Sequence, residues 1–366
     1  MLEETDECRS VYAVAAAGTG LPPKILEKDV WLCWTVDVLF SQDGRPQIAF
    51  KGGTSLSKVY GVTDRFSEDI DITIALDPDA NAGLPALRSA AKKVREQFGA
   101  QLKSYLQEVV APLVSSALAP YVDDPSECVI MLDDETVVLD YPNCFDKEGG
   151  YLAERVSMEF GARNRLVPSE SHVITPYVTD FVTGKEGELP LATVDVLSAA
   201  RTFREKATLA HDECNRGQWD RGADRISRHR YDLARLSEHE VGESALTDRE
   251  LLADVVAVKN VHFARGTSHY EDCSTGRIRL VADQIGLDAL RCAALRADYA
   301  EMAGGGMFRA EALDFDWILD RVGVLETTIN NGAPGNDSAP TGPTSGSSGS
   351  ECHSRPASGL GTRRPL

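Results

Sequence analysis

Residues 51–58 read KGGTSLSK and residues 65–71 read RFSEDID, and these two stretches decide the fold. Residues 47–50 predict a short strand that leads into the two glycines, and residues 54–60 predict the helix after the turn. From residue 69 onward, isoleucines at 70, 72 and 74 alternate with polar residues, the period-two pattern of a strand with one apolar face. The sequence therefore predicts a strand, a glycine turn and a helix, followed closely by a second strand.

The glycine turn combines groups that can bind a phosphate. Gly52 and Gly53 allow the backbone to approach a ligand closely. The backbone N–H groups at the start of the helix, with the hydroxyls of Thr54 and Ser55, can donate hydrogen bonds to phosphate oxygens. Lys58 adds a positive charge at the end of this stretch, so these five residues are candidates for nucleotide binding.

The second strand carries a candidate metal site. Asp69 and Asp71 lie two residues apart, so both carboxylates point to one face of the strand. They suit Mg²⁺, with Mn²⁺ as the alternative ion, because Mg²⁺ is usually held by one or two carboxylates plus substrate phosphates. A Gly-Gly turn alone is usually only a turn, and an acidic pair alone is usually a solvated face, but the two together are far less common. The sequence contains neither a P-loop motif nor G-x-G-x-x-G.

The rest of the chain divides into an α/β half and a helical half. Helical patterns occupy residues 26–40 and 84–118, and further strands are predicted at residues 128–132, 136–140, 155–161 and 175–182. After residue 197 the pattern is helical, over residues 199–215, 225–238, 248–263, 287–302 and 315–330.

These patterns predict an α/β (α+β) fold in four parts. We expect an N-terminal extension (1–22), an α/β domain with a mixed sheet (23–190) and a helical domain (191–330). The tail (331–366) is rich in Gly, Ser, Pro and Thr, and we expect it to be disordered because it cannot bury enough apolar surface to offset the entropy of ordering.

Composition and charge exclude several classes of protein. The 366 residues include 38 Lys or Arg against 57 Asp or Glu, and a net charge of −19 argues against a protein that coats nucleic acid by bulk charge. The eight cysteines are scattered singly, which fits reduced thiols in the cytoplasm. No signal peptide or membrane span is visible, so we expect a cytoplasmic protein with no membrane partner.

One segment departs from the acidic average. Residues 201–235 contain nine Lys or Arg against six acids, a local excess of three positive charges. Such a segment could bind a phosphate backbone, although solvated helix faces explain such counts about as often.

Three motifs carry a resemblance to a known family. A G-[GT]-x-S segment followed by D-x-D resembles the signature of nucleotidyltransferases with the DNA polymerase β fold, and the longer string over residues 51–71 is similar to the AbiEii/AbiGii toxin family among them. Residues 203–206 (FREK) resemble the lysine motif of that family, and residues 227–233 (SRHRYDL) resemble its terminal aspartate motif. The resemblance spans roughly residues 23–330 and implies a polymerase-β-like domain followed by a helical domain.

The resemblance implies that Asp69, Asp71, Lys206 and Asp232 are catalytic. Without the resemblance, Lys206 would be interpreted as a surface lysine at the edge of an apolar helix stripe. Asp232 would read as a member of an exposed ion pair within a helix.

Sites of this kind usually add a third carboxylate from an adjoining strand. Glu159 is our candidate, because it shares one face of its strand with Ser157 while the apolar residues share the other. Asp195 competes for that role. Glu68 should point away from Asp69 and is left out of the metal site.

The function implied is that of a Mg²⁺-dependent nucleotidyltransferase, the toxin of a bacterial toxin–antitoxin system. It would transfer NMP from an NTP to the 3′ end of tRNA and so block translation, with a cognate antitoxin as its partner. Asp69, Asp71 and Glu159 would hold the metal ions while a hydroxyl attacks the α-phosphorus and expels pyrophosphate. Lys206 would steady the triphosphate, and Asp232 would orient Lys206 or the acceptor.

Two alternatives and one regulatory expectation remain. The acceptor could instead be a small-molecule or protein hydroxyl, or the chain could bind nucleotides without turnover. A phosphate on Ser67 would add a charge of about −1.5 to −2 beside the metal carboxylates and should switch the site off.

Overall fold

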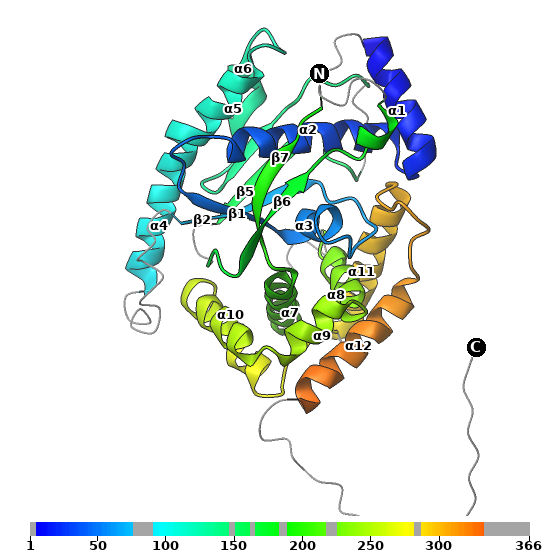
Figure 1. The fold of residues 1–366 in the computed structure, drawn as a ribbon. Coiled ribbons are helices and arrows are strands. Elements are labelled where there is room, and N and C mark those ends of the chain that lie inside the picture. The colour runs from blue at the N-terminus through cyan, green and yellow to red at the C-terminus, as the bar shows by residue number, and fades with distance from the viewer. Residues whose placement is uncertain are drawn as a thin grey trace, which may run out of the picture.

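The computed structural model describes residues 5–75, 91–145, 151–161, 165–182, 189–216, 225–281 and 287–332. Within these residues seven strands form one mixed sheet in the order β3-β4-β5-β2-β1-β7-β6 (Figure 1). The strands are β1 (Gln47–Lys51), β2 (Asp69–Ala75), β3 (Val129–Met131), β4 (Thr136–Leu139), β5 (Val156–Gly161), β6 (Ser169–Ile174) and β7 (Ala192–Leu197).

The register of the central strands aligns one row of charged residues. β1 and β2 are antiparallel, with Lys51 opposite Asp71, and β2 and β5 are parallel, with Asp71 opposite Glu159. The alternate residues of β2, from Ile70 to Ile74, are buried in an apolar core. Because side chains alternate along a strand, the charged row faces away from this core.

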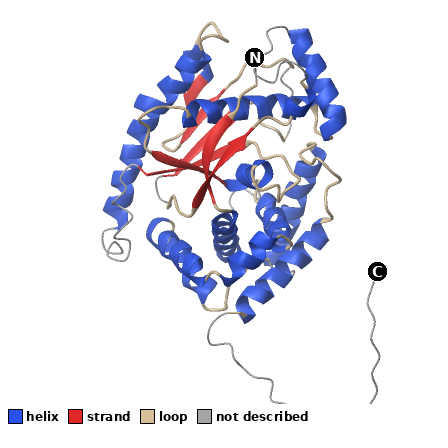
Figure 2. Cartoon of the chain, in the orientation of Figure 1, coloured by secondary structure: helices blue, strands red, loops and turns tan. Residues whose placement is uncertain are grey.

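Helices cover both faces of the sheet (Figure 2). On the apolar face, α2 (Pro23–Phe40), α4 (Ala91–Tyr105) and α5 (Ala111–Leu118) complete the core with the sheet. A π-helical turn, Leu106–Val110, joins α4 to α5. The charged face is turned toward the helical region that follows β7, and α3 (Gly52–Lys58) lies at the end of β1.

The helical region forms a second core with the N-terminal segments. In this core, Leu26 of α2 and Leu56 of α3 are buried together with Phe203 and Tyr231. Helix α1 (Thr5–Thr19) packs on α2. The helices that follow the sheet are α7 (Ala199–Asn215), α8 (Ser227–Ser237), α9 (Glu240–Thr247), α10 (Arg249–His262), α11 (Leu287–Gly304) and α12 (Phe315–Asn331).

The predicted fold class is confirmed, as are the helical second half and the strands near residues 47, 69, 128, 136 and 155. The strand predicted at 175–182 is wrong: the strand is β6, and residues 179–181 form a 3₁₀ turn. β6 is mostly exposed and polar, so it lacks the apolar pattern. Val178 and Val182, which lie within the predicted range, pack into the second core.

Two further expectations concern the domain boundary and the segments outside the described residues. β7 belongs to the sheet although it lies beyond residue 190, and the division into domains stays a prediction. The expected helix over 84–118 is described only from residue 91, and the tail beyond residue 332 lies outside the described residues. Among the helices described, none is both long and apolar enough to cross a membrane.

Candidate active site

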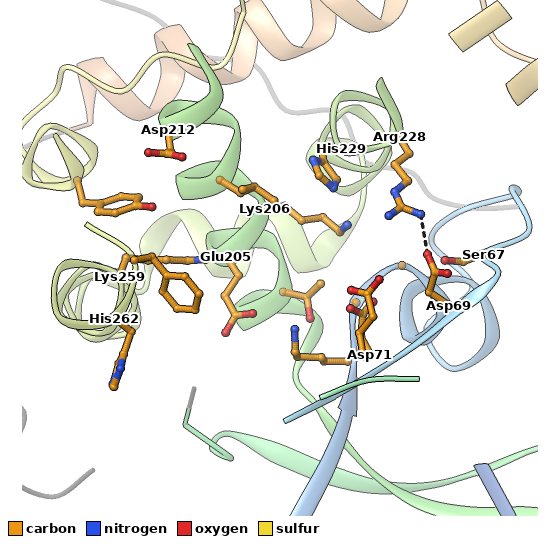
Figure 3. A pocket seen from close by; sticks show the side chains of 18 of the residues that line it. Ser67, Asp69, Asp71, Glu205, Lys206, Asp212, Arg228, His229, Lys259 and His262 are labelled. Carbon is orange, nitrogen blue, oxygen red and sulfur yellow. Dashed lines mark hydrogen bonds and ion pairs between the residues drawn. The ribbon is translucent and has the colours of Figure 1, made fainter. Parts of the chain in front are cut away.

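The charged row of the sheet lines a cavity of about 640 Å³. One wall comes from β1, β2, β5 and α3, and the other comes from α7, α8 and α10 (Figure 3). Its lining includes most of the residues that the sequence singled out, namely Gly52, Gly53, Ser67, Asp69, Asp71, Glu159 and Lys206. The cavity therefore brings together residues of all three motifs, 51–58, 203–206 and 227–233, which lie far apart in the chain.

Gly52 is required by the position of Asp71. Its φ of +79° lies in the left-handed region, and a Cβ there would be 2.0 Å from Asp71 Oδ2. A Cβ on Gly53 would lie 2.5 Å from Arg65 Nη2 and 2.7 Å from Ser67 Oγ. The glycine pair thus allows the loop before β2, and β2 itself, to pack directly against the start of α3.

Three carboxylates line the sheet side of the cavity. Burial and the charges of Asp71 and Asp69 raise the pKa of Glu159 to about 7. Asp195 is exposed on β7 and is not among the residues that line the cavity. The positions of the two side chains therefore favour Glu159 over Asp195 as the third carboxylate. Its role as a metal ligand stays a prediction.

The donor chemistry of this wall fits a hard divalent cation. Asp69 and Asp71 offer oxygen ligands on one face, and repulsion between them and Glu159 is of the kind that a cation relieves. In the described part of the chain, no group of three or more His, Cys, Asp or Glu is arranged closely enough to hold a metal ion by itself. A site here would thus combine the two aspartates with substrate oxygens, as Mg²⁺ sites commonly do.

Lys51 lies in the same row of the sheet. Burial alone would lower the pKa of Lys51, but the carboxylates of Asp71, Glu205 and Glu159 raise it above its usual value. The ammonium is therefore charged and partly neutralises this wall.

Asp232 is held behind the cavity wall. Its side chain is fully buried, it accepts hydrogen bonds from Arg65 Nε (2.8 Å) and Nη2 (2.7 Å), and it pairs with Lys206 Nζ at 2.8 Å. Burial would raise the pKa of Asp232, but Arg65 and Lys206 lower it far below its usual value. Arg65 and Lys206 line the cavity and Asp232 does not. This geometry suits the expected role of Asp232 in orienting Lys206 and extends it to Arg65, while the catalytic assignment of Asp232 stays a prediction.

Arg228 was missed as a site residue. Arg228 lies one turn from Asp232 on α8, but its Nη1 donates to Asp69 Oδ2 at 2.9 Å (Figure 3). This contact joins residues 159 positions apart, so no local pattern could reveal it. Arg228 adds a cation beside the carboxylates, in the cavity that Lys51, Arg65 and Lys206 also line.

Three of the predicted phosphate-binding side chains lie elsewhere. Thr54 Oγ1 donates to Asp69 O at 2.6 Å, and Ser55 Oγ donates to Gly52 O at 2.9 Å. Lys58 pairs with the buried Asp29 at 2.7 Å and lies over the ring of Tyr177. These side chains stabilise the loop and the core rather than line the cavity. Their contact with nucleotide stays a prediction, whereas Gly52 and Gly53 themselves line the cavity.

The residues that flank Asp69 have separate surroundings. Ser67 lines the cavity but is only 5% exposed. Glu68 is buried on the other side, where it pairs with Lys28 Nζ at 2.7 Å and with Arg225. The prediction that Glu68 points away from the metal site is confirmed.

The far wall of the cavity was also missed. It contains acidic, basic and aromatic side chains from α7, α10 and the segment that follows α10. The α7 members recur at steps of three or four residues along the helix, so the helical face beside Lys206 could have identified them. Burial and Lys51 lower the pKa of Lys259, although Glu205 opposes the shift. The wall is formed by Thr202, Glu205, Leu209, Asp212, Arg216, Lys259, His262, Phe263, Arg265 and Tyr270.

Comparison with known proteins adds independent information. The model of a family described as "Nucleotidyl transferase AbiEii toxin, Type IV TA system" matches residues 37–321. Among solved structures, the chain is similar to MenT4, a nucleotidyltransferase toxin from Mycobacterium tuberculosis H37Rv, with 19% identity and a TM-score of 0.42 over 88% of this chain and 97% of that chain. No curated protein matches the sequence.

Proposed function

The chain belongs to the AbiEii family of nucleotidyl transferase toxins from type IV toxin–antitoxin systems, and from this premise we propose that it transfers NMP from an NTP to the 3′ end of tRNA. Membership makes it a nucleotidyltransferase with an antitoxin as its partner. The proposal adds the tRNA acceptor, the metal ion and a cytoplasmic site of action, where NTP and tRNA are found.

One observation carries the proposal. A single cavity brings together the carboxylates of Asp69 and Asp71 and the cations Arg65, Lys206 and Arg228. Carboxylates suit a metal ion, and cations suit the phosphates of a triphosphate. Phosphoryl transfer depends mainly on such positioning and charge stabilisation.

Different residues would bind the metal ion and the triphosphate. Asp69 and Asp71, together with substrate oxygens, would hold Mg²⁺ or Mn²⁺, which supplies charge that activates the acceptor hydroxyl and neutralises phosphate, and Glu159 is the candidate third carboxylate. Lys206 and Arg65, both fixed by Asp232, would bind the triphosphate. The backbone N–H groups near Gly53 would donate to the outgoing phosphates.

The far wall supports an RNA acceptor. Lys259 and Arg265 bring positive charge to the α10 side, and Phe263 offers an aromatic surface. Unpaired bases at an RNA end commonly stack on such rings. A small-molecule or protein hydroxyl needs neither feature.

Label transfer tests the proposal. Purified protein is incubated with each α-labelled NTP, Mg²⁺ and total tRNA, and we expect label in tRNA with at least one NTP. Asp71→Asn should reduce the rate about 10³-fold, because loss of a metal ligand removes several kcal/mol of charge stabilisation. Asp195→Asn is the matched control and should retain activity. Label absent from tRNA with every NTP, or equal losses in both variants, would contradict the proposal.

Regulation through Ser67 is a separate proposal. A phosphate there would bring negative charge next to Asp69 and block metal binding. Because Ser67 is 5% exposed, a kinase could reach it only after the loop before β2 opens. If mass spectrometry of protein expressed with its antitoxin finds Ser67 always unmodified, this proposal fails.

A further inference from the structure

A buried chain of polar groups ends at the active-site cavity. His229 Nδ1 lies 3.0 Å from Glu213 Oε1, and the other oxygen of Glu213 pairs with Arg230. The side chains of Glu213 and Arg230 are 3% and 0% exposed, whereas His229 is 17% exposed and lines the cavity. Neither the family motifs nor the proposed reaction gives this histidine a role.

The contact with Glu213 determines which ring nitrogen is available. Burial would raise the pKa of Glu213, but Arg230 and His229 hold it at about 2, so Glu213 is a carboxylate at neutral pH. A carboxylate only accepts hydrogen bonds, so Nδ1 of His229 carries a proton and donates it to Glu213. Nε2 is then the nitrogen that exchanges a proton with a ligand.

His229 lies among the cations of the proposed phosphate site. Figure 3 shows its ring beside Lys206 and Arg228. Burial lowers the pKa of His229, Glu213 opposes the shift, and Lys206 and Arg228 lower the pKa further. A bound triphosphate would compensate the charges of these two cations, while Glu213 would continue to favour the imidazolium. Substrate binding would therefore favour protonation of His229 beside the leaving group.

We propose that His229 is the general acid of the reaction and donates its Nε2 proton to the departing pyrophosphate; this inference rests on the proposed function. The acceptor hydroxyl releases its proton to solvent as its oxygen forms a bond to the α-phosphorus, and the bond from the α-phosphorus to the bridging oxygen breaks. That oxygen keeps the electron pair and takes the proton from Nε2. Neutral His229, held by Glu213, regains a proton from solvent before the next turnover.

Donors with different leaving groups test the role of His229. Single-turnover rates are measured for wild type and His229→Gln with the natural NTP and with its β,γ-methylene and β,γ-difluoromethylene analogues, which are close in shape. General acid catalysis typically contributes 10²–10⁴-fold, so we expect His229→Gln to lose about 10²-fold with NTP. The loss should be larger with the basic methylene leaving group and less than about tenfold with the acidic difluoromethylene one.

The controls separate this inference from the proposed function. His172→Gln, on β6 outside the cavity, should match wild type with every donor. If wild type transfers nothing, the proposed function fails. If wild type is active but the loss in His229→Gln is the same for all three donors, His229 is not the general acid.

The pH dependence gives a second readout. The charged groups that act on the ring are Glu213 and Lys206 from α7 and Arg228 from α8. A general acid must be protonated, so the rate falls as pH rises through its pKa in the complex. Glu213 raises that pKa, and Glu213→Gln should shift this fall to lower pH. An unchanged profile in folded Glu213→Gln protein would overturn the role of the carboxylate.

Discussion

Two groups of charged side chains lie on opposite sides of the loop and strand around Asp69, and they differ in what surrounds them. The cavity group contains Asp69, Lys206 and Arg228, which line an open space. The buried group contains Glu68, Lys28 and Arg225, of which Glu68 and Lys28 have side chains 2% and 1% exposed. The neighbouring carboxylates of Glu68 and Asp69 therefore have different roles. Because Glu68 is buried it stabilises the fold, whereas Asp69 lines the cavity and can contact a substrate.

Glu68→Gln should have the largest effect on stability. Lys28 and Arg225 would lose their shared counter-charge while still mostly shielded from water, and breaking a buried pair costs about 3–5 kcal/mol. Urea denaturation measures the loss. Glu170→Gln, on the exposed strand β6, is the control and should change the free energy of unfolding by less than about 0.5 kcal/mol. A loss below about 1 kcal/mol for Glu68→Gln would remove the distinction between the two groups.

The Glu213 pair should stabilise the fold in a pH-dependent way. The pKa of Glu213 is about 2 in the folded protein against an ordinary value of 4.5, which corresponds to about 3 kcal/mol. Because the folded-state pKa is the lower one, this stabilisation is complete above about pH 5 and is lost as pH falls toward 2. Urea denaturation of wild type and Glu213→Gln should give curves that converge at acid pH. A difference independent of pH would contradict the assignment.

Lys206→Met should show the opposite behaviour to Glu68→Gln. Its transfer rate should fall about 10²-fold, since a cation that binds the triphosphate is lost. Its free energy of unfolding should fall by less than about 1 kcal/mol, because Asp232 keeps both hydrogen bonds to Arg65. Label transfer and urea denaturation on the same preparation measure both values. A stability loss as large as that of Glu68→Gln would place Lys206 in the buried group.

The smallest effect is expected at an exposed ion pair. Lys103 pairs with Asp134 at 2.8 Å, with side chains 46% and 69% exposed. Such pairs contribute about 0–1 kcal/mol because water screens them. Lys103→Met should leave the transfer rate unchanged and shift the free energy of unfolding by less than about 0.5 kcal/mol, so it also serves as the control for Lys206→Met.

Part of the candidate site could be predicted from local spacing. Asp69 and Asp71 were expected on one face of a strand, and Glu159 on the corresponding face of another, because side chains alternate along a strand. The register of β2 with β5 then places Asp71 directly opposite Glu159. Lys206 was expected at the edge of an apolar helix stripe, and the structure places it there, at the cavity wall.

Other parts depended on contacts between distant segments. Lys58 and Lys206 both belong to a recognisable motif, but Lys58 pairs with Asp29 in the core while Lys206 lines the cavity. Asp232 pairs with Arg65 of the loop before β2, and Arg228 pairs with Asp69 of β2, in each case across more than 150 residues. Sequence spacing carries no information about such pairings.

The sequence by itself determined the elements and the chemistry they carry, because the periods of strands and helices and the conformational needs of a glycine turn are local properties. It also determined the family, since the motifs appear in order along the chain. Only the tertiary structure decided which charges face the cavity and which are buried, because burial depends on how α3, α7 and α8 pack against the sheet. That packing makes Asp232 a support for Arg65 and Lys206, and it brings Arg228 and His229 to the site.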